Sequence, residues 1–147
     1  MALGDLFVFD EGLVSLTVGP TLVADEVWVG LVTETCLVTD PIPAYASGGT
    51  TNYTAIATSG EYAAGGLLLD TIANIALEAA GVLSFKDTGA SVTWAQNGTS
   101  PQNARFAVVY NKTTNLCYCG IDLGAAVDMQ AGALTITWNA SGMFTIT

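Results

Sequence analysis

The chain has 147 residues, of which 51% are hydrophobic and 11% are charged, against about 25% charged residues in an ordinary soluble domain. Thirteen acidic residues face three basic ones, which gives a formal net charge of −10 and argues against nucleic acid as a partner, because phosphate binding depends on clustered Lys and Arg. The apolar residues fall in short runs, too short to cross a bilayer. We therefore expect part of the surface to be buried against other protein chains.

The N-terminal region is predicted to form an arm or edge strand over residues 1–20, followed by a single β-sandwich domain over residues 21–147. Pro20 marks the boundary, and the apolar residues before it follow no clear single period. The segment carries Asp5 and Asp10 but no Lys or Arg, unlike a secretory signal, which needs a basic start. We therefore expect synthesis in the cytoplasm.

The first half of the domain contains one clear strand. In Asp25–Thr33 the residues Val27, Val29 and Leu31 share one face, and Trp28 lies on the other. The proline-containing segment 40–60 cannot be a central strand, and a connection of this length is usually functional or an assembly arm. Two further stretches of this half are also expected to form strands. Residues 67–77 fit a helix or two strands broken near Asp70–Thr71, with strands favoured, and Val82–Phe85 is expected to be another strand.

The second half alternates more regularly, with a period of two that is typical of strands. Apolar residues on both faces of Ala104–Tyr110 indicate a central strand or one covered by a neighbouring subunit. A turn and a returning strand over Leu116–Leu123 follow it. Half-buried strands are predicted at Ser91–Ala95 and Gly132–Trp138, and the latter is expected to form a C-terminal hairpin with Met143–Thr147.

The pattern as a whole predicts an all-β fold. Eight to ten short strands with Gly- and Asn-rich turns are typical of a single-domain antiparallel β-sandwich or jelly-roll-like barrel with an N-terminal arm.

Residue types that carry chemistry are sparse. The absence of histidine removes the commonest general base and metal ligand. Asp122 and Asp128 flank Gly124 and could offer oxygen ligands to Ca²⁺, but the sequence has no Asp-x-Asp-x-Asp-Gly pattern, and solvated loop acids explain them better. We predict no catalytic residue, no cofactor and no metal site, and hence a protein that is not an enzyme.

The three cysteines, Cys36, Cys117 and Cys119, are too few for structural zinc without histidine. The spacing of Cys117 and Cys119 in an extended run places both on one face. Buried free thiols are the favoured interpretation, with a single bridge from Cys36 to one of the pair as the alternative.

The tryptophans divide into two groups. Trp94 and Trp138 share faces with aliphatic residues and are expected in the core. Trp28 lies on the opposite face from its apolar neighbours. It could be a core residue of a sandwiched strand, an intersubunit anchor, since Trp is enriched at interface hot spots, or a glycan contact.

The ordered motifs of the chain resemble a widespread group of small structural proteins of tailed bacteriophages, over about Val23 to Thr147. The motifs that carry the resemblance are Val27–Thr33, Gly60-Glu-Tyr-Ala-Ala-Gly-Gly-Leu67, Phe85 with Val92-Thr-Trp94, Ala104-Arg-Phe-Ala-Val-Val-Tyr-Asn111, Ile121-Asp-Leu-Gly124, Gly132-Ala-Leu-Thr-Ile-Thr-Trp-Asn139 and Gly142-Met-Phe-Thr-Ile-Thr147. The resemblance implies a virion component, and the role we expect is that of a head decoration or cement protein on the outer capsid surface. Its expected partners are the major capsid protein and further copies of itself, as a homotrimer.

Two other roles remain open: a fibre module that binds host glycans, and a structural protein of the tail or of head completion. For an assembly role, the candidate interface residues are Phe7, Phe9, Trp28, Ile42, Tyr45, Ala107 and Val109.

Overall fold

The computed structural model describes residues 4–17, 26–69, 75–79, 82–85, 91–138 and 144–146. The described residues are mostly β, with one short helix, which confirms the predicted all-β antiparallel class, and their sheets do not close into a barrel. The elements in chain order are β1 (Leu6–Val8), α1 (Asp10–Thr17), β2 (Val27–Val32), β3 (Pro43–Tyr45), β4 (Thr51–Tyr53), β5 (Leu67–Leu68), β6 (Ile75–Ala79), β7 (Val82–Phe85), β8 (Ser91–Trp94), β9 (Ala104–Asn111), β10 (Cys117–Val127), β11 (Leu134–Thr137) and β12 (Phe144–Ile146).

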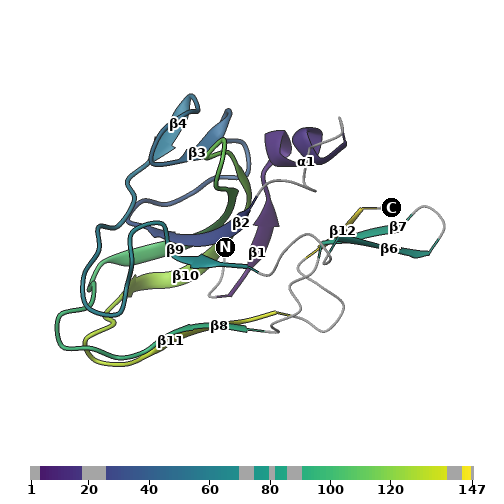
Figure 1. Cartoon of the computed structure of the whole chain (residues 1–147). Helices are drawn as coiled ribbons and strands as arrows, with labels where there is room; N and C mark the ends of the chain where they lie inside the picture. Colours follow the sequence, from purple (N-terminus) through teal and green to yellow (C-terminus); the bar gives the residue numbers. More distant parts are fainter. Residues whose placement is uncertain are drawn as a thin grey trace.

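The main sheet has five strands in the order β1-β10-β9-β2-β5, and all neighbours are antiparallel (Figure 1). Strand β9 lies at its centre between β10 and β2, as predicted from its apolar residues on both faces. Both faces of β9 are covered by the chain itself, so the central-strand interpretation holds without a neighbouring subunit.

One face of the main sheet is covered by the paired strands β8 and β11, which lie below it in Figure 1. Cross-strand pairs such as Val92 with Ile136 set the register, and the hydroxyls of Thr93 and Thr135 meet at 3.0 Å on the outer face. We call the interior on this side the strand-side core. Its buried members are Val27, Val29, Leu31, Ile56, Tyr62, Leu69, Val92, Trp94, Ala104, Ala107, Val109, Tyr118, Cys119, Ile121, Leu123, Met129, Ile136 and Trp138.

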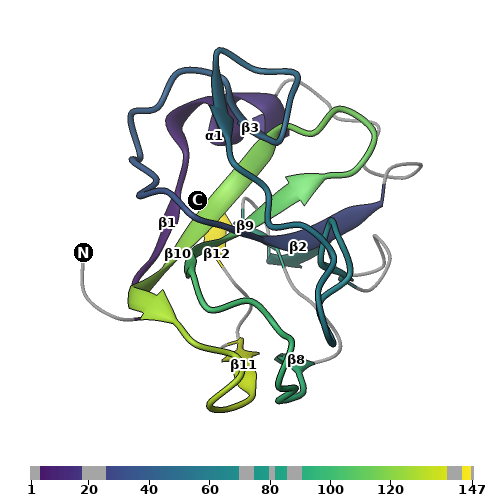
Figure 2. The same ribbon diagram turned by 90° about the vertical axis from the view of Figure 1, so that its left-hand side faces the viewer.

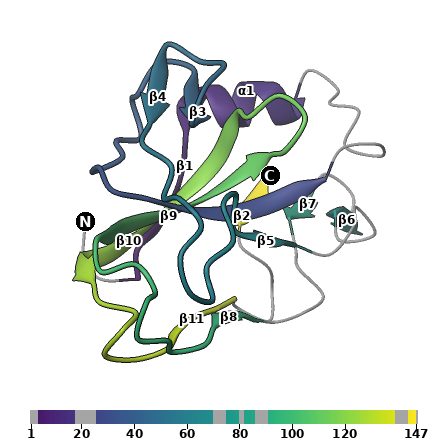
Figure 3. The ribbon, with the colours of Figure 1, turned by 60° about the vertical axis from the view of Figure 1, so that its left-hand side comes forward.

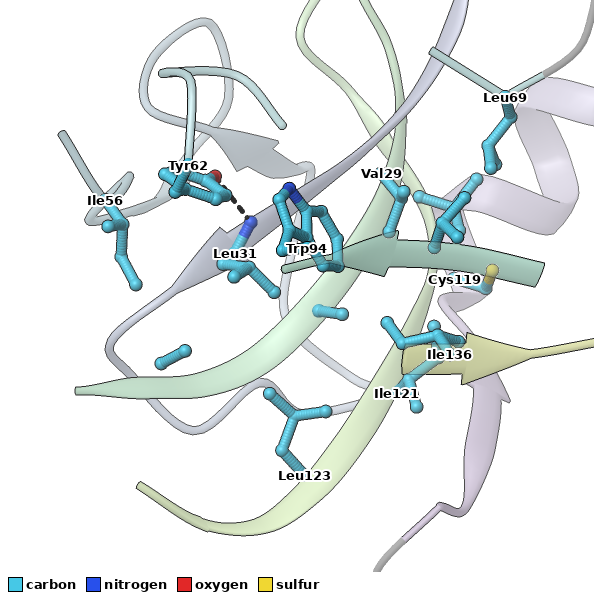
Figure 4. Packing of buried hydrophobic residues seen from close by; sticks show 14 of the residues in the cluster. Val29, Leu31, Ile56, Tyr62, Leu69, Trp94, Cys119, Ile121, Leu123 and Ile136 are labelled. Carbon is cyan, nitrogen blue, oxygen red and sulfur yellow. Dashed lines mark hydrogen bonds between the residues drawn. The ribbon is translucent and has the colours of Figure 1, made fainter. Parts of the chain in front are cut away.

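Trp94 lies in the middle of this strand-side core, near Tyr62, Leu31 and Val29 (Figure 4). Both Trp94 and Trp138 are buried, which confirms the prediction that they are core residues. The alternation of β8 and β11 thus reports faithfully which side chains face the sheet.

The opposite face is covered by short elements and connecting chain: the start of α1, the loop after β2 and the small parallel pair β3–β4 (Figure 1). We call this interior the loop-side core, and its buried members are Phe9, Val32, Cys36, Tyr45, Tyr53, Phe106, Val108, Tyr110 and Cys117. Segment 40–60 is therefore no central strand, as predicted, but contributes two three-residue strands, β3 and β4, to this cover.

The C-terminal hairpin prediction is wrong. Strand β11 pairs with β8, while β12 pairs with β7 in a separate sheet of order β12-β7-β6. The turn-forming residues before Met143 suggested a local pairing, but the apolar face of β11 matches that of β8. Strands β5 and β6 confirm the choice of strands over a helix in residues 67–77. The predicted break at Asp70–Thr71 lies outside the described residues.

The N-terminal segment forms an edge strand and a helix. Strand β1 pairs with β10 at one edge of the main sheet (Figure 2). Helix α1 was not predicted, because its apolar residues follow no clear single period and Gly12, Val14 and Thr17 are poor helix formers. Tertiary packing explains it: a Cβ at Gly12 would lie 2.6 Å from the carbonyl oxygen of Tyr118, so glycine lets the helix approach β10 closely. The described residues include no helix with the length and apolarity to cross a membrane.

A β-bulge divides the two nearby cysteines between the faces of the sheet. Cys117 pairs with Tyr110 and Cys119 with Val109, so Tyr118 is the extra residue. Cys117 consequently lies in the loop-side core and Cys119 in the strand-side core. The prediction that both share one face is wrong, because a bulge shifts the alternation by one residue.

Candidate functional site: an exposed apolar patch

The predicted interface residues occupy three different environments. Ile42 is exposed, and Phe7 and Trp28 are half-buried. The remaining members (Phe9, Tyr45, Ala107 and Val109) are buried in the two cores. These buried residues stabilise the chain itself. Of the predicted interface residues, a partner could therefore contact Ile42, Phe7 and Trp28.

Phe7 and Phe9 anchor the N-terminal segment. Their rings meet edge-on at 5.2 Å between centroids, and Phe9 also contacts Tyr53 at 6.1 Å. Phe7 lies over Gly120, where a Cβ would come within 2.6 Å of the ring. This pair therefore holds β1 and α1 against the main sheet.

A cluster of tyrosines joins the two faces of the sheet. The Tyr45 and Tyr62 hydroxyls are 3.1 Å apart, and the Tyr62 hydroxyl accepts a 2.9 Å hydrogen bond from the Leu31 backbone N–H. Tyr45 stacks on Tyr110 with ring centroids 4.4 Å apart. The Tyr110 hydroxyl donates to the Gly65 carbonyl at 3.0 Å. Burial raises the pKa of Tyr62 well above its usual value. Its hydroxyl therefore stays protonated and has a structural role, as a hydrogen-bond partner inside the protein.

Trp28 is held by two polar neighbours. Its Nε1 donates to the Glu26 carboxylate at 2.9 Å, and the Lys112 ammonium lies 4.6 Å from the ring centroid. This is a cation–π contact. The lysine therefore covers one face of the ring, on which a sugar could otherwise stack.

The cysteines are buried and free among the described residues, in agreement with the favoured interpretation of unpaired thiols. Burial is the main cause that raises the pKa of Cys36 to about 12, and it raises the pKa values of Cys117 and Cys119 as well. A thiol is reactive as the thiolate, so none of the three has the environment of a nucleophile.

The two aspartates considered for Ca²⁺ are each held by protein groups. Asp122 forms a salt bridge with Arg105 and accepts a 2.6 Å hydrogen bond from the Gly124 N–H. Asp128 accepts from the side chain of Gln102 and from the Gln130 N–H. Within the described residues, no group of three or more His, Cys, Asp or Glu is placed to hold a metal ion.

The described residues also expose several large apolar side chains on α1 and on the chain between β2 and β3. Leu13, Leu37, Val38 and Ile42 are each 40–52% exposed, and we call them the apical patch. The Asp10 N–H donates to the Val38 carbonyl at 3.2 Å, which fixes the loop after β2 against the start of α1. Figure 3 shows α1, β3 and β4 together at this end of the molecule.

Ile42 has an unusual backbone. Its φ is +44°, a region that β-branched residues seldom enter. Pro41 and Pro43 flank it, its carbonyl accepts from the Thr50 N–H at 3.2 Å, and the Pro41 carbonyl accepts from Thr51 at 3.1 Å. A Cβ at Gly49 would collide with the Ile42 carbonyl oxygen, so glycine is required there.

Sequence reasoning identified Ile42 but missed Leu13, Leu37 and Val38. Leu13 was missed because the apolar residues around it follow no clear helical period. The Leu-Val pair follows Cys36 in a segment without period, and only the fold shows that it points outward. Comparison with protein-family models, with curated proteins and with solved structures finds no match for this chain.

Proposed function

We propose that this chain is a virion structural protein, a decoration or cement protein that stabilises a phage head by bridging coat subunits. The observation that carries the proposal is the apical patch, because a group of exposed apolar side chains offers a surface for contact with another protein. The resemblance of the ordered motifs to tailed-phage structural proteins supplies the setting. In this role the major capsid protein is the partner, and no catalytic residue, cofactor or metal is involved.

The way in which such a protein acts follows from its packing. Two cores on opposite faces of one sheet, joined by the tyrosine cluster, make a body that resists deformation. Fully burying an aliphatic side chain contributes about 1.5–3 kcal/mol. Four such partly exposed residues at each of many sites on a shell therefore add a substantial total stabilisation, by contact alone.

Self-association as a homotrimer is part of the proposal. Leu68 is 46% exposed on the sheet-edge strand β5, and Figure 3 shows β5 below α1, β3 and β4. The outer side of β5 has no strand partner among the described residues. Sedimentation of the purified chain tests this point, and Leu68→Asp is expected to lower the observed mass if β5 lies in the trimer contact.

The decisive experiment adds the purified chain to heads that lack it and measures the temperature at which they release DNA. We expect a higher release temperature with the wild-type chain and with Ala133→Asp, an exposed position before β11 at the opposite end. We expect no gain with Ile42→Asp. An unchanged release temperature with wild-type chain bound to the heads contradicts the proposal.

A glycan-binding fibre module is the alternative from another class. Trp28 beside Glu26 has the residue types for it, but Lys112 already covers one face of the ring. A glycan array with the wild-type chain and Lys112→Ala tests it. Binding that appears or strengthens in the variant supports the alternative. A structural role in the tail or in head completion differs from decoration by position on the particle, which a density map of the virion distinguishes.

A further inference from the structure

The apical patch has a definite chemical border. Asp10 and Glu11 are exposed in the first turn of α1, next to Leu13. Asp40 closes the turn that carries Leu37 and Val38, where its carboxylate accepts from the Leu37 N–H at 2.8 Å. The border of the patch is therefore acidic.

The chain has few basic residues that could pair with the acidic border of a second copy. Of its three basic residues, Lys86 lies outside the described residues. Arg105 is paired with Asp122, and Lys112 lies over Trp28. Two copies that met patch to patch would bring carboxylates against carboxylates, and like charges opposed across an interface cost several kcal/mol.

The loop that carries Ile42 is also held by backbone hydrogen bonds. The positive φ of Ile42 and the hydrogen bonds from Thr50 and Thr51 hold the apolar side chain outward before any partner arrives. Backbone strain of this kind costs about 1–3 kcal/mol and is maintained chiefly at functional positions. A preorganised loop loses less conformational freedom on binding and so binds more tightly.

We propose that the apical patch docks onto a different protein, whose contact surface is an apolar pocket bordered by Lys and Arg, and not onto a second copy of this chain. Ile42 enters the pocket, Leu13, Leu37 and Val38 surround it, and the acidic border pairs with the partner's cations. This inference deepens the proposed function, since it names the surface and the partner chemistry. Self-association then uses a different face.

The test replaces Ile42 with the photo-cross-linker p-benzoylphenylalanine in the full-length chain, produced in its natural host cell, with the same replacement at Ala133 as the matched control. We expect a covalent adduct from position 42 to another polypeptide, at a site of apolar residues flanked by Lys or Arg, and at least tenfold less of that adduct from position 133. Adding Leu37→Asp to the cross-linking variant is expected to reduce the adduct at least tenfold.

An adduct from position 42 to a second copy of the chain overturns the inference. So does an adduct at an acidic or wholly polar site, or equal yields from positions 42 and 133. If Leu37→Asp proves to unfold the chain by circular dichroism, Leu37→Ser takes its place with the same expectation.

Salt separates the charge part of the inference from the apolar part. Raising NaCl from about 0.1 M to about 1 M shortens the Debye length from about 10 Å to about 3 Å. We expect the adduct yield to fall with salt for the wild-type border and to change less when Asp10 and Glu11 are both replaced by Asn and Gln. A yield that rises with salt in the wild-type border contradicts an acidic–basic contact.

The outcomes for the proposed function and for this inference are distinct. If the chain is present in virions but position 42 cross-links to its own kind, the docking inference fails and the structural role stands. If the chain is absent from virions but position 42 cross-links to a basic apolar site on another protein, the virion role fails and the docking inference stands.

Discussion

The strand-side and loop-side cores flank the same sheet and are built differently. The strand-side core is closed by β8 and β11, whose alternating side chains fill it with aliphatic residues and Trp94. The loop-side core is closed by irregular chain, and it relies on stacked tyrosines, buried thiols and glycines at close approaches. Regular strands satisfy their own backbone hydrogen bonds, whereas irregular chain has to find partners one by one. The irregular cover is what carries the exposed apical patch.

Replacing Val109 with Asp is expected to have the largest effect. Val109 has no exposed surface in the strand-side core, and an unpaired buried carboxylate costs several kcal/mol. Domains are stable by about 5–15 kcal/mol, so most of that margin would be lost, as measured by urea unfolding. Thr113→Ala in the exposed β9–β10 turn is the control. A loss below about 1 kcal/mol in Val109→Asp would contradict the assignment of β9 as the doubly covered centre.

Gly49→Ala tests the loop-side cover. The new Cβ would collide with the Ile42 carbonyl, so the loop has to shift at a cost of about 2 kcal/mol. Gly98→Ala is the matched control, because a Cβ there meets nothing within 4 Å, and a change within about 0.5 kcal/mol is expected. Thermal unfolding of both variants measures the contrast. Equal stabilities would show that the Ile42 loop is not held as described.

Tyr62→Phe and Tyr53→Phe compare one hydroxyl from each core. The Tyr62 change leaves the buried Leu31 N–H without its acceptor, which costs about 1–3 kcal/mol. Tyr53 donates to the Asp40 carboxylate at 2.6 Å in a part-buried position, where water can replace it, so a loss of about 1 kcal/mol or less is expected. Denaturant midpoints measure both. A larger loss of stability for Tyr53→Phe than for Tyr62→Phe would contradict this prediction.

The smallest expected effect is on how stability depends on pH at the acidic end. The hydrogen bond and charge of Arg105 hold the pKa of Asp122 below its usual value. A lowered carboxyl pKa contributes stability above the unfolded pKa of about 3.9, and that contribution is lost as the pH falls through the still lower folded value. Asp122→Asn is therefore expected to be less stable than wild type at pH 7 and to lose less stability below about pH 4. Parallel pH profiles of the two proteins would contradict this coupling.

The sequence predicted the strand-side half of the molecule well. Period-two alternation located β2, β8, β9 and β11 and assigned the faces of Val27 and Trp94 correctly, because that core is formed by regular strands. The partner of β11 was assigned wrongly, since alternation identifies the buried face of a strand but leaves its neighbour undetermined.

The loop-side half could be predicted only in outline. Helix α1 depends on the close approach of Gly12 to Tyr118. The bulge at Tyr118 places Cys117 and Cys119 on opposite faces, where a shared face was expected. Neither contact leaves a local pattern in the sequence. The candidate site shows the same limit. Ile42 was chosen from the long proline-containing segment 40–60, whereas the hydrogen bond from Asp10 to Val38, which brings α1 to the loop after β2, leaves no sequence pattern.

The bulge at Tyr118 also affects how readily the cysteines are oxidised. By turning Cys117 and Cys119 to opposite sides of the sheet, it keeps the two sulfur atoms from meeting across one strand. Burial keeps each thiol protonated at neutral pH, and oxidation proceeds through the thiolate. Cys117 and Cys119 are therefore expected to resist oxidation to a bond with each other for as long as the sheet stays folded.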